Sequence, residues 1–313
     1  MAIYNLSYGK LESLIDRSFS PGTEHAIIDA IKSAGIVTPW SGKTGVEVEK
    51  TSGSYAISHN AQIFLDTGSH NTITINDDGA KLIAAGDGSN HIIDNGPGGD
   101  TLVGGAGAES LKVMHGENEL IAGSGANTLV GGAGNDTLIG GGSSLLEAGS
   151  GGSTLLGGLG DQSSSGHHGH GHSHHADLAP APSDTLKGGQ GDDLLQVAHG
   201  DNLLIAGGGH DTIFGGDGQD TIFGGGHDTI NLNYGNEFVQ GGSGSDLVHV
   251  GLHGNDIIYG GKATTVHSDQ TSSSIRNEVE VHGVTTITFS NHQVLTASNV
   301  AIEFADGHKT TVH

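Results

Sequence analysis

The sequence has no cysteine, few aromatic residues, few bases and no long hydrophobic run. Phe, Trp and Tyr together make up 4% of the 313 residues. Disulfides are therefore excluded as a source of stability, and a wide conventional core is unexpected because bulky side chains are scarce. No stretch approaches the roughly 20 apolar residues of a membrane span. The N-terminus lacks a basic start followed by an apolar run, so we expect no Sec-type signal peptide.

The shortage of bases leaves a large excess of acid. Lys and Arg number 11 against 35 Asp and Glu, which gives a net charge of −24 with His neutral. This balance argues against nucleic acid and against anionic membrane surfaces as partners. It suits a chain that takes up cations, and the self-repulsion predicts that folding is coupled to metal binding.

Glycine is abundant, with 57 residues, and from Gly188 to Gly261 it follows a nine-residue pattern, Gly-Gly-x-Gly-x-Asp-x-apolar-x. Such a fixed period indicates a solenoid. The glycines allow each unit to turn, and the β-branched or apolar residues after the Asp favour a very short strand. Two units then make one coil, and successive coils stack as parallel strands about 4.8 Å apart.

The eighth position of each unit points inward and forms a thin core. In the regular part of the chain this position holds Leu195, Leu204, Ile213, Ile222, Ile230, Val239, Val248 and Ile258.

The sixth position of each unit holds the candidate metal ligands. Because units two apart lie on the same side of the coil, these side chains form two columns. One column contains Asp193, Asp211, Asp228 and Asp246, and the other contains Asp184, Asn202, Asp220, Glu237 and Asp256. Stacked carboxylates repel unless a cation lies between them. Carboxylates with turn carbonyls nearby suit Ca²⁺, which accepts six to eight oxygens in flexible geometry, better than Mg²⁺. The predicted calcium ligands are Asp100, Asp136, Asp184, Asp193, Asp211, Asp220, Asp228, Asp246 and Asp256.

These units resemble the RTX repeats of secreted bacterial proteins, which also occur in serralysin-type proteases and haemolysin-like toxins. The resemblance implies an all-β fold, a right-handed parallel β-roll, with Ca²⁺ in the turns, folding in a calcium-rich exterior and type I export. It does not specify a function, because the same roll accompanies proteases, lipases, adhesins, toxins and surface-layer proteins.

The pattern divides the chain into six segments. They are an N-terminal helical cap (1–44), a metal-free solenoid start (45–85), a degenerate RTX roll (86–160), a His-rich inserted loop (161–182), the calcium-binding roll (183–261) and a C-terminal β cap with a possible secretion signal (262–313).

Helices are predicted over 10–16 and 23–31. We expect them to shield the open end of the solenoid, with a docking helix for a partner or a second copy as the alternative. The apolar residues Phe64, Ile73, Leu82 and Ile92 are spaced nine, nine and ten apart, so the solenoid is expected to start there.

The degenerate segment keeps the apolar eighth position but varies the sixth. Its sixth positions are Asn90, Asp100, Glu109, Asn118, Asn127, Asp136, Ser144 and Ser153. We expect a carboxylate role for Asp100 and Asp136, which share one column with Asn118 between them. Asn and Ser ladders hydrogen-bond without a cation, so fewer or weaker calcium sites are expected here.

The inserted loop contains the sequence GHHGHGHSHH. Its six clustered histidines are His167, His168, His170, His172, His174 and His175. Neutral imidazole binds Zn²⁺, Cu²⁺ or Ni²⁺, but a Gly/Ser-rich loop supplies no fixed ligand set. Incidental metal affinity, a physiological metal-binding or pH-responsive role and a plain spacer all remain open.

The C-terminal segment alternates as strands over 278–281, 285–289, 293–296 and 300–304. It resembles the strand-rich C-terminal part of RTX proteins, where an export signal is expected. However, the chain ends Lys-Thr-Thr-Val-His and not in the acidic residue and apolar tail common in protease-type signals.

No HExxH, Cys nucleophile or Walker-type motif is present, so we predict that the protein is not an enzyme. The first hypothesis is a secreted or cell-surface bacterial protein that assembles with itself, or with surface or matrix components, into a filament, surface layer or biofilm matrix. The alternatives are an adhesin or Zn²⁺-binding module that uses the histidine loop, and a hydrolase with an unrecognised site.

Overall fold

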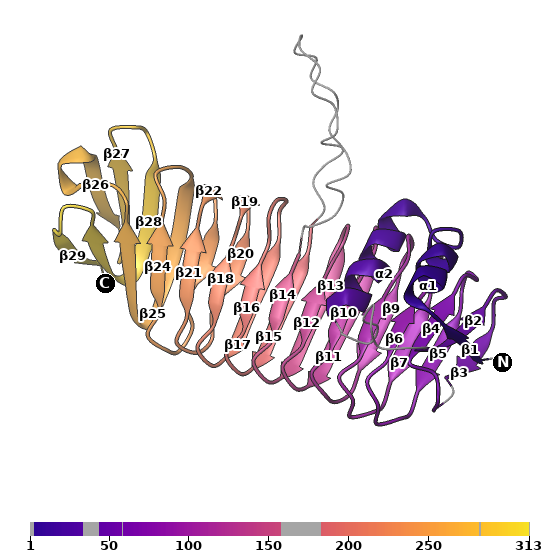
Figure 1. The fold of residues 1–313 in the computed structure, drawn as a ribbon. Helices are drawn as coiled ribbons and strands as arrows, with labels where there is room; N and C mark the ends of the chain where they lie inside the picture. The colour runs from indigo at the N-terminus through magenta and orange to yellow at the C-terminus, as the bar shows by residue number, and fades with distance from the viewer. Residues whose placement is uncertain (1–2, 34–43, 58, 158–182, 282, 313) are drawn as a thin grey trace, which may run out of the picture. The chain divides into compact units, whose positions relative to one another are not determined.

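The structure is a computed structural model that describes residues 3–33, 44–57, 59–157, 183–281 and 283–312. It divides into two compact units, the first with the described residues up to Thr154 and the second with those from Leu155 onward. Both units consist of stacked parallel strands (Figure 1). The predicted all-β parallel solenoid is therefore confirmed.

In the first unit the strands from β2 onward pair with the strand two further along the chain. One sheet contains β2 (Thr44–Glu49), β4 (Ile63–Asp66), β6 (Leu82–Ala84), β8 (Thr101–Val103), β10 (Glu119–Ile121) and β12 (Thr137–Ile139). The other contains β3 (Ser54–Ala56), β5 (Thr72–Ile75), β7 (His91–Asp94), β9 (Ser110–Val113), β11 (Asn127–Ala133) and β13 (Ser144–Ser150). A further strand, β14 (Thr154–Leu156), begins at the end of this unit.

The second unit repeats the arrangement. One sheet contains β15 (Thr185–Gln190), β17 (Leu203–Gly208), β20 (Thr221–Phe223) and β23 (Phe238–Gln240). The other contains β16 (Leu194–Gln196), β18 (Thr212–Phe214), β21 (Thr229–Leu232) and β24 (Leu247–Val250), and two short strands, β19 (Asp217–Gly218) and β22 (Tyr234–Gly235), pair in the turns. Leu195 lies opposite Ile213, one coil away, as the doubled nine-residue unit predicts.

The core is a single inward-facing column from each sheet. All eight predicted eighth-position residues from Leu195 to Ile258 are fully buried. In the first unit, Phe64 lies opposite Ile83, and Ile83 lies opposite Leu102, so Ile83 faces the core and the regularly spaced Leu82 does not. Both faces of β6 are buried, so the apolar pattern alone does not distinguish inward from outward positions.

Leu82 is buried because two helices cover the outer face of this sheet. They are α1 (Tyr8–Ile15) and α2 (Pro21–Ser33), the latter with proline at its first position, where no helical N–H bond is lost. Leu11 and Ile31 pack with Leu65 and Leu82 in one apolar cluster. The helices therefore lie along the side of the first unit (Figure 1), which corrects the prediction that they shield its open end. At that end, β1 (Ile3–Leu6) pairs antiparallel with β2.

Among the described residues, no helix is both long enough and apolar enough to span a membrane.

The C-terminal part of the second unit changes from coils to a hairpin-rich sheet. It comprises β25 (Asn255–Ser268), the 3₁₀ turn η2 (Ser272–Ser274), β26 (Ile275–Val281), β27 (Val284–Phe289), β28 (Val294–Phe304) and β29 (Lys309–Val312). Strand β28 pairs parallel with β25 and antiparallel with β27 and β29. The predicted strands over 293–296 and 300–304 form one strand, with Asn299 at a positive φ of 53° between them.

Adjacent turns stack so closely that some glycines are required. Gly209 has φ of 136°, and a Cβ placed there would overlap the carbonyl oxygen of Gly191 in the preceding coil. A Cβ placed at the neighbouring Gly208 would have no atom within 4 Å.

This contrast gives a matched pair of variants. Gly209→Ala is expected to lower the free energy of unfolding by about 1–3 kcal/mol or more, because it combines backbone strain with a clash. Gly208→Ala is expected to change it by less than about 0.5 kcal/mol. Urea unfolding in saturating calcium measures both, and equal effects of the two variants would contradict the close turn stacking.

Candidate calcium-binding turns

The sixth-position aspartates of the second unit form the predicted column. The backbone N–H of Asp193 donates to Oδ1 of Asp211 at 2.7 Å. Asp211 N donates in turn to Asp228 Oδ1 at 3.2 Å, and Asp228 N to Asp246 Oδ1 at 3.3 Å. Each carboxylate thus binds the backbone of the coil before it, which fixes one of its two oxygens.

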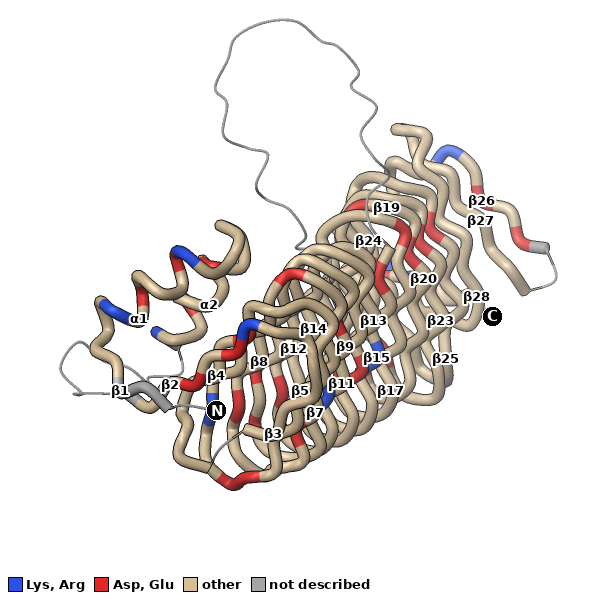
Figure 2. Tube along the Cα trace, turned by 90° about the vertical axis from the view of Figure 1, so that its right-hand side faces the viewer, with Lys and Arg blue, Asp and Glu red and all other residues tan. Residues whose placement is uncertain are grey.

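The second predicted column is also present. Asp184 N donates to Asn202 Oδ1 at 2.8 Å, and Asn202 N donates to Asp220 Oδ1 at 2.9 Å. Glu237 N donates to Asp256 Oδ1 at 3.2 Å. Within each unit, acidic residues recur at the same point of neighbouring coils (Figure 2).

The second carboxylate oxygen has a hydrogen-bond donor in some turns and none in others. Asp228 Oδ2 accepts from Gly225 N at 2.8 Å, and Asp246 Oδ2 accepts from Thr264 Oγ1 at 3.0 Å. Oδ2 of Asp211, Oδ2 of Asp220 and Oε1 of Glu237 are inaccessible to solvent and accept no hydrogen bond. The first-position glycines make room for these groups, since a Cβ at Gly224 would lie 2.8 Å from Asp228 Oδ2. A buried charged oxygen without a partner is costly, so the turns favour a proton or a cation at this position.

Burial shifts the titration of these groups strongly. Burial raises the pKa of Asp211 and of Asp220 to about 6. Burial, together with the neighbouring Asp256 carboxyl, raises the pKa of Glu237 to about 9. The pKa values of Asp246 and Asp256 are raised too, again mainly by burial. Without a cation the folded turns therefore bind protons more tightly than an extended chain does.

Where the sixth residue is asparagine, its hydrogen bonds show which backbone atoms of the turn face this side chain. Asn202 Nδ2 donates to the carbonyl oxygen of Gly200 at 2.9 Å and to Asp220 Oδ1 at 2.9 Å. Asn127 Nδ2 donates in the same way to the carbonyls of Gly123 and Gly141, both at 2.9 Å. Turn carbonyls therefore point at the sixth side chain, and an amide satisfies them.

An aspartate at the same position offers no donor to those carbonyls. At Asp211 and Asp220, where no donor reaches Oδ2, carboxylate oxygens lie in the turn as free acceptors, and this is the ligand chemistry of Ca²⁺. Asp193, Asp211, Asp228 and Asp246 would hold the ion in the uninterrupted column. When bound, calcium supplies the positive charge that makes the stacked carboxylates mutually compatible.

In the first unit, the predicted column runs through Asp100 and Asp136. Asp100 N donates to Asn118 Oδ1 at 2.9 Å, and Asn118 N donates to Asp136 Oδ1 at 2.9 Å. Oδ2 of Asp100 and Oδ2 of Asp136 are buried and accept no hydrogen bond. Asp136 N finally donates to Ser153 Oγ at 3.2 Å. The two aspartates therefore occupy the same kind of turn as those of the second unit.

Several buried carboxyls of the first unit were not predicted as ligands from the sequence, among them Glu109, Asp66 and Asp94. Glu109 stands in the other column, where its Oε2 accepts from Asn90 N at 3.1 Å and burial raises its pKa to about 8. Asp66 and Asp94 lie where the regular unit has its first glycine, and both are fully buried. Burial raises the pKa of Asp66 to about 6, and burial with the Asp94 contact raises that of Asp100 to about 8. An acidic residue in place of the first glycine was the signal available.

The histidine cluster from His167 to His175 lies outside the described residues. Elsewhere, His210 and His227 stack at the fifth position with ring centroids 5.2 Å apart, and Ser245 N donates to His227 Nδ1 at 3.0 Å. Among the described residues, no three His, Asp or Glu side chains come close enough together to hold a metal ion. No group of described residues supports the predicted Zn²⁺ site.

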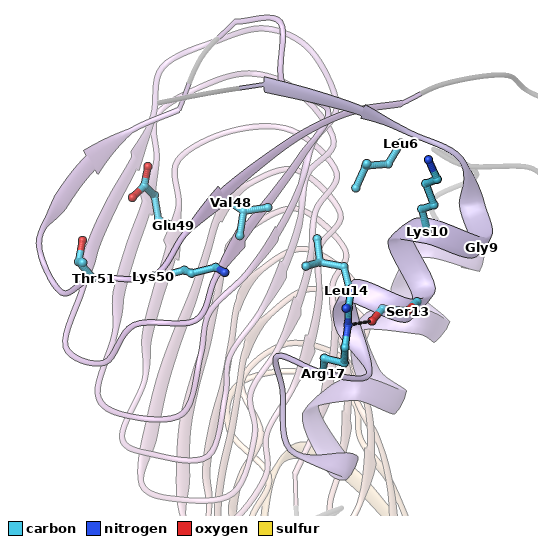
Figure 3. Close-up of a pocket in the computed structure, with 10 residues that line it drawn as sticks. All are labelled: Leu6, Gly9, Lys10, Ser13, Leu14, Arg17, Val48, Glu49, Lys50 and Thr51. Atoms are coloured by element: carbon cyan, nitrogen blue, oxygen red, sulfur yellow. Dashed lines mark hydrogen bonds between the residues drawn. The ribbon is translucent and has the colours of Figure 1, made fainter.

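A groove on the first unit is a separate candidate binding surface (Figure 3). Its volume is about 720 Å³, and it lies between α1 and the end of β2. Leu6, Leu14 and Val48 give it an apolar lining, while Lys10, Arg17 and Lys50 also line it; the full lining is Leu6, Gly9, Lys10, Ser13, Leu14, Arg17, Val48, Glu49, Lys50 and Thr51.

The fold and the turns together define a class, a parallel β-roll with buried carboxylate oxygens in its turns. Five stretches match the family model described as RTX calcium-binding nonapeptide repeat (4 copies), namely residues 116–144, 183–212, 199–226, 224–248 and 233–263. The chain carries RTX-type repeats over these matched stretches, and the resemblance inferred from its sequence is confirmed there. The coils before residue 116 lie outside the match. No curated protein matches the chain.

Replacing a sixth-position aspartate by asparagine is expected to make its turn less dependent on calcium, and the reverse replacement to make a turn more dependent on it. Asp211→Asn keeps the acceptor for Asp193 N but supplies an amide donor to the turn, as Asn202 does. We expect at least about tenfold weaker calcium binding at this turn, together with a more stable calcium-free roll. Asn202→Asp should have the opposite effects. Isothermal titration with Ca²⁺ and thermal melts in calcium-free buffer measure both, and an unchanged titration for Asp211→Asn would contradict the site.

Acid is expected to stabilise the calcium-free roll. Asp211 and Asp220 have folded pKa values of about 6 against an ordinary 3.8, so the folded state binds protons more tightly. This stabilisation is complete below about pH 4 and is lost as the pH rises through about 6. In calcium the trend should reverse, because protons compete with the ion. Circular dichroism during urea unfolding at pH 4.5 and pH 7.5 tests this; parallel trends in both buffers would contradict it.

Proposed function

We propose that the protein is a secreted, calcium-stabilised structural protein that associates with copies of itself in an extracellular filament, surface layer or biofilm matrix. The observation that carries this proposal is that each unit has an edge strand that is paired on one side only. Among the described strands, β3 in the first unit pairs with β5 alone, and β26 in the second pairs with β27 alone. Unpaired strand edges are templates for pairing with another chain.

Charge supports the same proposal. Three of the 11 bases of the chain line the apolar groove beside α1 and β2, whereas the chain as a whole carries a net charge of −24. Strand β26 is exposed and presents Glu278 and Glu280 on one face, with Val279 45% exposed on the other. An acidic, partly apolar strand of one copy complements a basic, partly apolar groove of another. Unlike surfaces that meet in this way generate open assemblies.

Calcium concentration would regulate this assembly. The turns of the RTX repeats bind Ca²⁺, and an ion that binds only the folded state stabilises that state as its concentration rises. The protein would then remain incompletely folded where calcium is scarce and become competent to assemble outside the cell. This order fits the secretion that the family resemblance implies.

Charge reversal in the groove tests the proposal. In millimolar calcium, the wild-type protein is expected to form assemblies that are visible by sedimentation velocity and electron microscopy. A variant with Lys10→Glu, Arg17→Glu and Lys50→Glu should assemble at least about tenfold less readily, because opposite charges become like charges. Mixing it with copies that carry Glu278→Lys and Glu280→Lys should restore association. The matched control is Lys112→Glu, which reverses an exposed lysine of β9 outside the groove.

Two outcomes distinguish self-association itself from the groove as its contact surface. A wild-type protein that stays strictly monomeric in millimolar calcium would overturn self-association. Wild-type assembly that survives the groove reversal would retain self-association and exclude the groove as the contact.

The alternative role in transition-metal capture or adhesion rests on the histidine insertion. That segment lies outside the described residues, so this role stays a prediction of the sequence.

A further inference from the structure

A buried lysine stands at the beginning of the acidic column in the first unit. Lys81 is 3% exposed and is the one Lys or Arg among the described residues that is buried. Buried lysines are rare unless their charge is paired. No calcium-repeat match covers this part of the chain, since the first one begins at residue 116. The reason for the burial must therefore lie in the local contacts.

The strand register places Lys81 at the sixth position of its unit. Leu82 lies opposite Ile63 on one side and Thr101 on the other, so Lys81 directly precedes Asp100 in the column. Its backbone N–H donates to Asp100 Oδ1 at 2.6 Å. Asp193 N makes the equivalent bond to Asp211 in the second unit. Lys81 thus occupies a backbone position equivalent to that of a calcium-binding aspartate.

The side chain of Lys81 supplies a positive charge to the turn. Its Nζ lies 2.7 Å from the carbonyl oxygen of Ala61 and 3.4 Å from that of His59, both in the preceding coil. It also lies 3.1 Å from Asp77 Oδ2 in its own turn. An ammonium group has three donors; here it donates to two carbonyls and forms an ion pair with one carboxylate. These are the kinds of oxygen atom that a calcium ion binds.

The surrounding charges fit a permanently bound cation. Burial alone would raise the pKa of Asp77, but the Gly79 N–H and the Lys81 ammonium together hold it below its ordinary value. Lys81 also acts to lower the pKa of Asp100, against the larger effects of burial and of Asp94. His59 Nδ1 lies 2.9 Å from Asp77 Oδ2 but is mostly exposed. Lys81 is therefore the buried counter-charge of this group of carboxylates.

We propose that the Lys81 ammonium takes the place of a calcium ion in this turn, so that the coils over 45–103 hold their fold without calcium. A tethered cation does not depend on ion concentration, whereas the occupancy of a calcium site does. The helices α1 and α2 pack on the same coils through the apolar cluster around Leu82. The first coils therefore form a calcium-independent folded end, and the RTX repeats over 183–263 form the calcium-responsive part. This inference does not depend on self-association.

Hydrogen exchange of the full chain, followed by mass spectrometry, tests the inference. In wild type, backbone amides over 63–103 should be equally protected in EGTA and in millimolar calcium, whereas amides over 194–250 should lose protection in EGTA. Lys81→Met should speed exchange over 63–103 by roughly ten- to hundredfold in both buffers, because the carbonyls and Asp77 lose a buried partner. Lys81→Arg should retain most of the protection in EGTA.

A further variant tests whether this turn can be made dependent on calcium. Lys81→Asp should lose protection over 63–103 in EGTA and regain it in calcium, because an aspartate at this position recreates an acceptor-only turn. Lys112→Met, which alters an exposed lysine of the same unit, is the control and should behave as wild type.

Two results would overturn the inference. One is loss of wild-type protection over 63–103 in EGTA, and the other is a Lys81→Met protein that exchanges like wild type. A Lys81→Asp protein that calcium fails to protect would overturn the equivalence between the ammonium and the ion.

Discussion

The structure depends on one hydrogen bond repeated from coil to coil, in which the backbone N–H at the sixth position donates to the sixth side chain of the next coil. This bond sets the stacking of the turns but commits only one oxygen of each carboxylate. In several turns, such as those of Asp211 and Asp220, the second oxygen is then buried without a donor. Three side chains resolve this conflict differently: asparagine adds amide donors, Lys81 adds an ammonium group, and aspartate requires a cation.

The thin core explains why the turns matter so much. In the second unit the inward residue of each short strand, such as Ile213 or Ile222, is fully buried, while its strand neighbours are only half-buried. Little apolar area per coil is then available to offset the cost of ordering the glycine-rich backbone. Stability must come from the turns, so the ion that joins them has a large influence on folding.

The first unit differs because α1 and α2 cover the outer face of one sheet. Leu65 and Leu82 point away from the solenoid interior, yet they are fully buried beneath the helices. This second apolar layer gives these coils a conventional core in addition to the inward column. Such packing reduces the dependence of the fold on its turns, in agreement with the lysine that replaces an aspartate there.

The sequence by itself determined the period, the two columns and the calcium chemistry, because each depends on spacing along one chain. A nine-residue repeat places Asp211 and Asp228 in one column whatever surrounds them. Tertiary structure alone decided that Ile83 faces inward and Leu82 outward, that Asp66 and Asp94 are buried, and that the Lys81 ammonium lies among the turn carbonyls. Where the repeat degenerates, spacing no longer fixes which way a side chain points, and contacts between residues distant in sequence determine its environment.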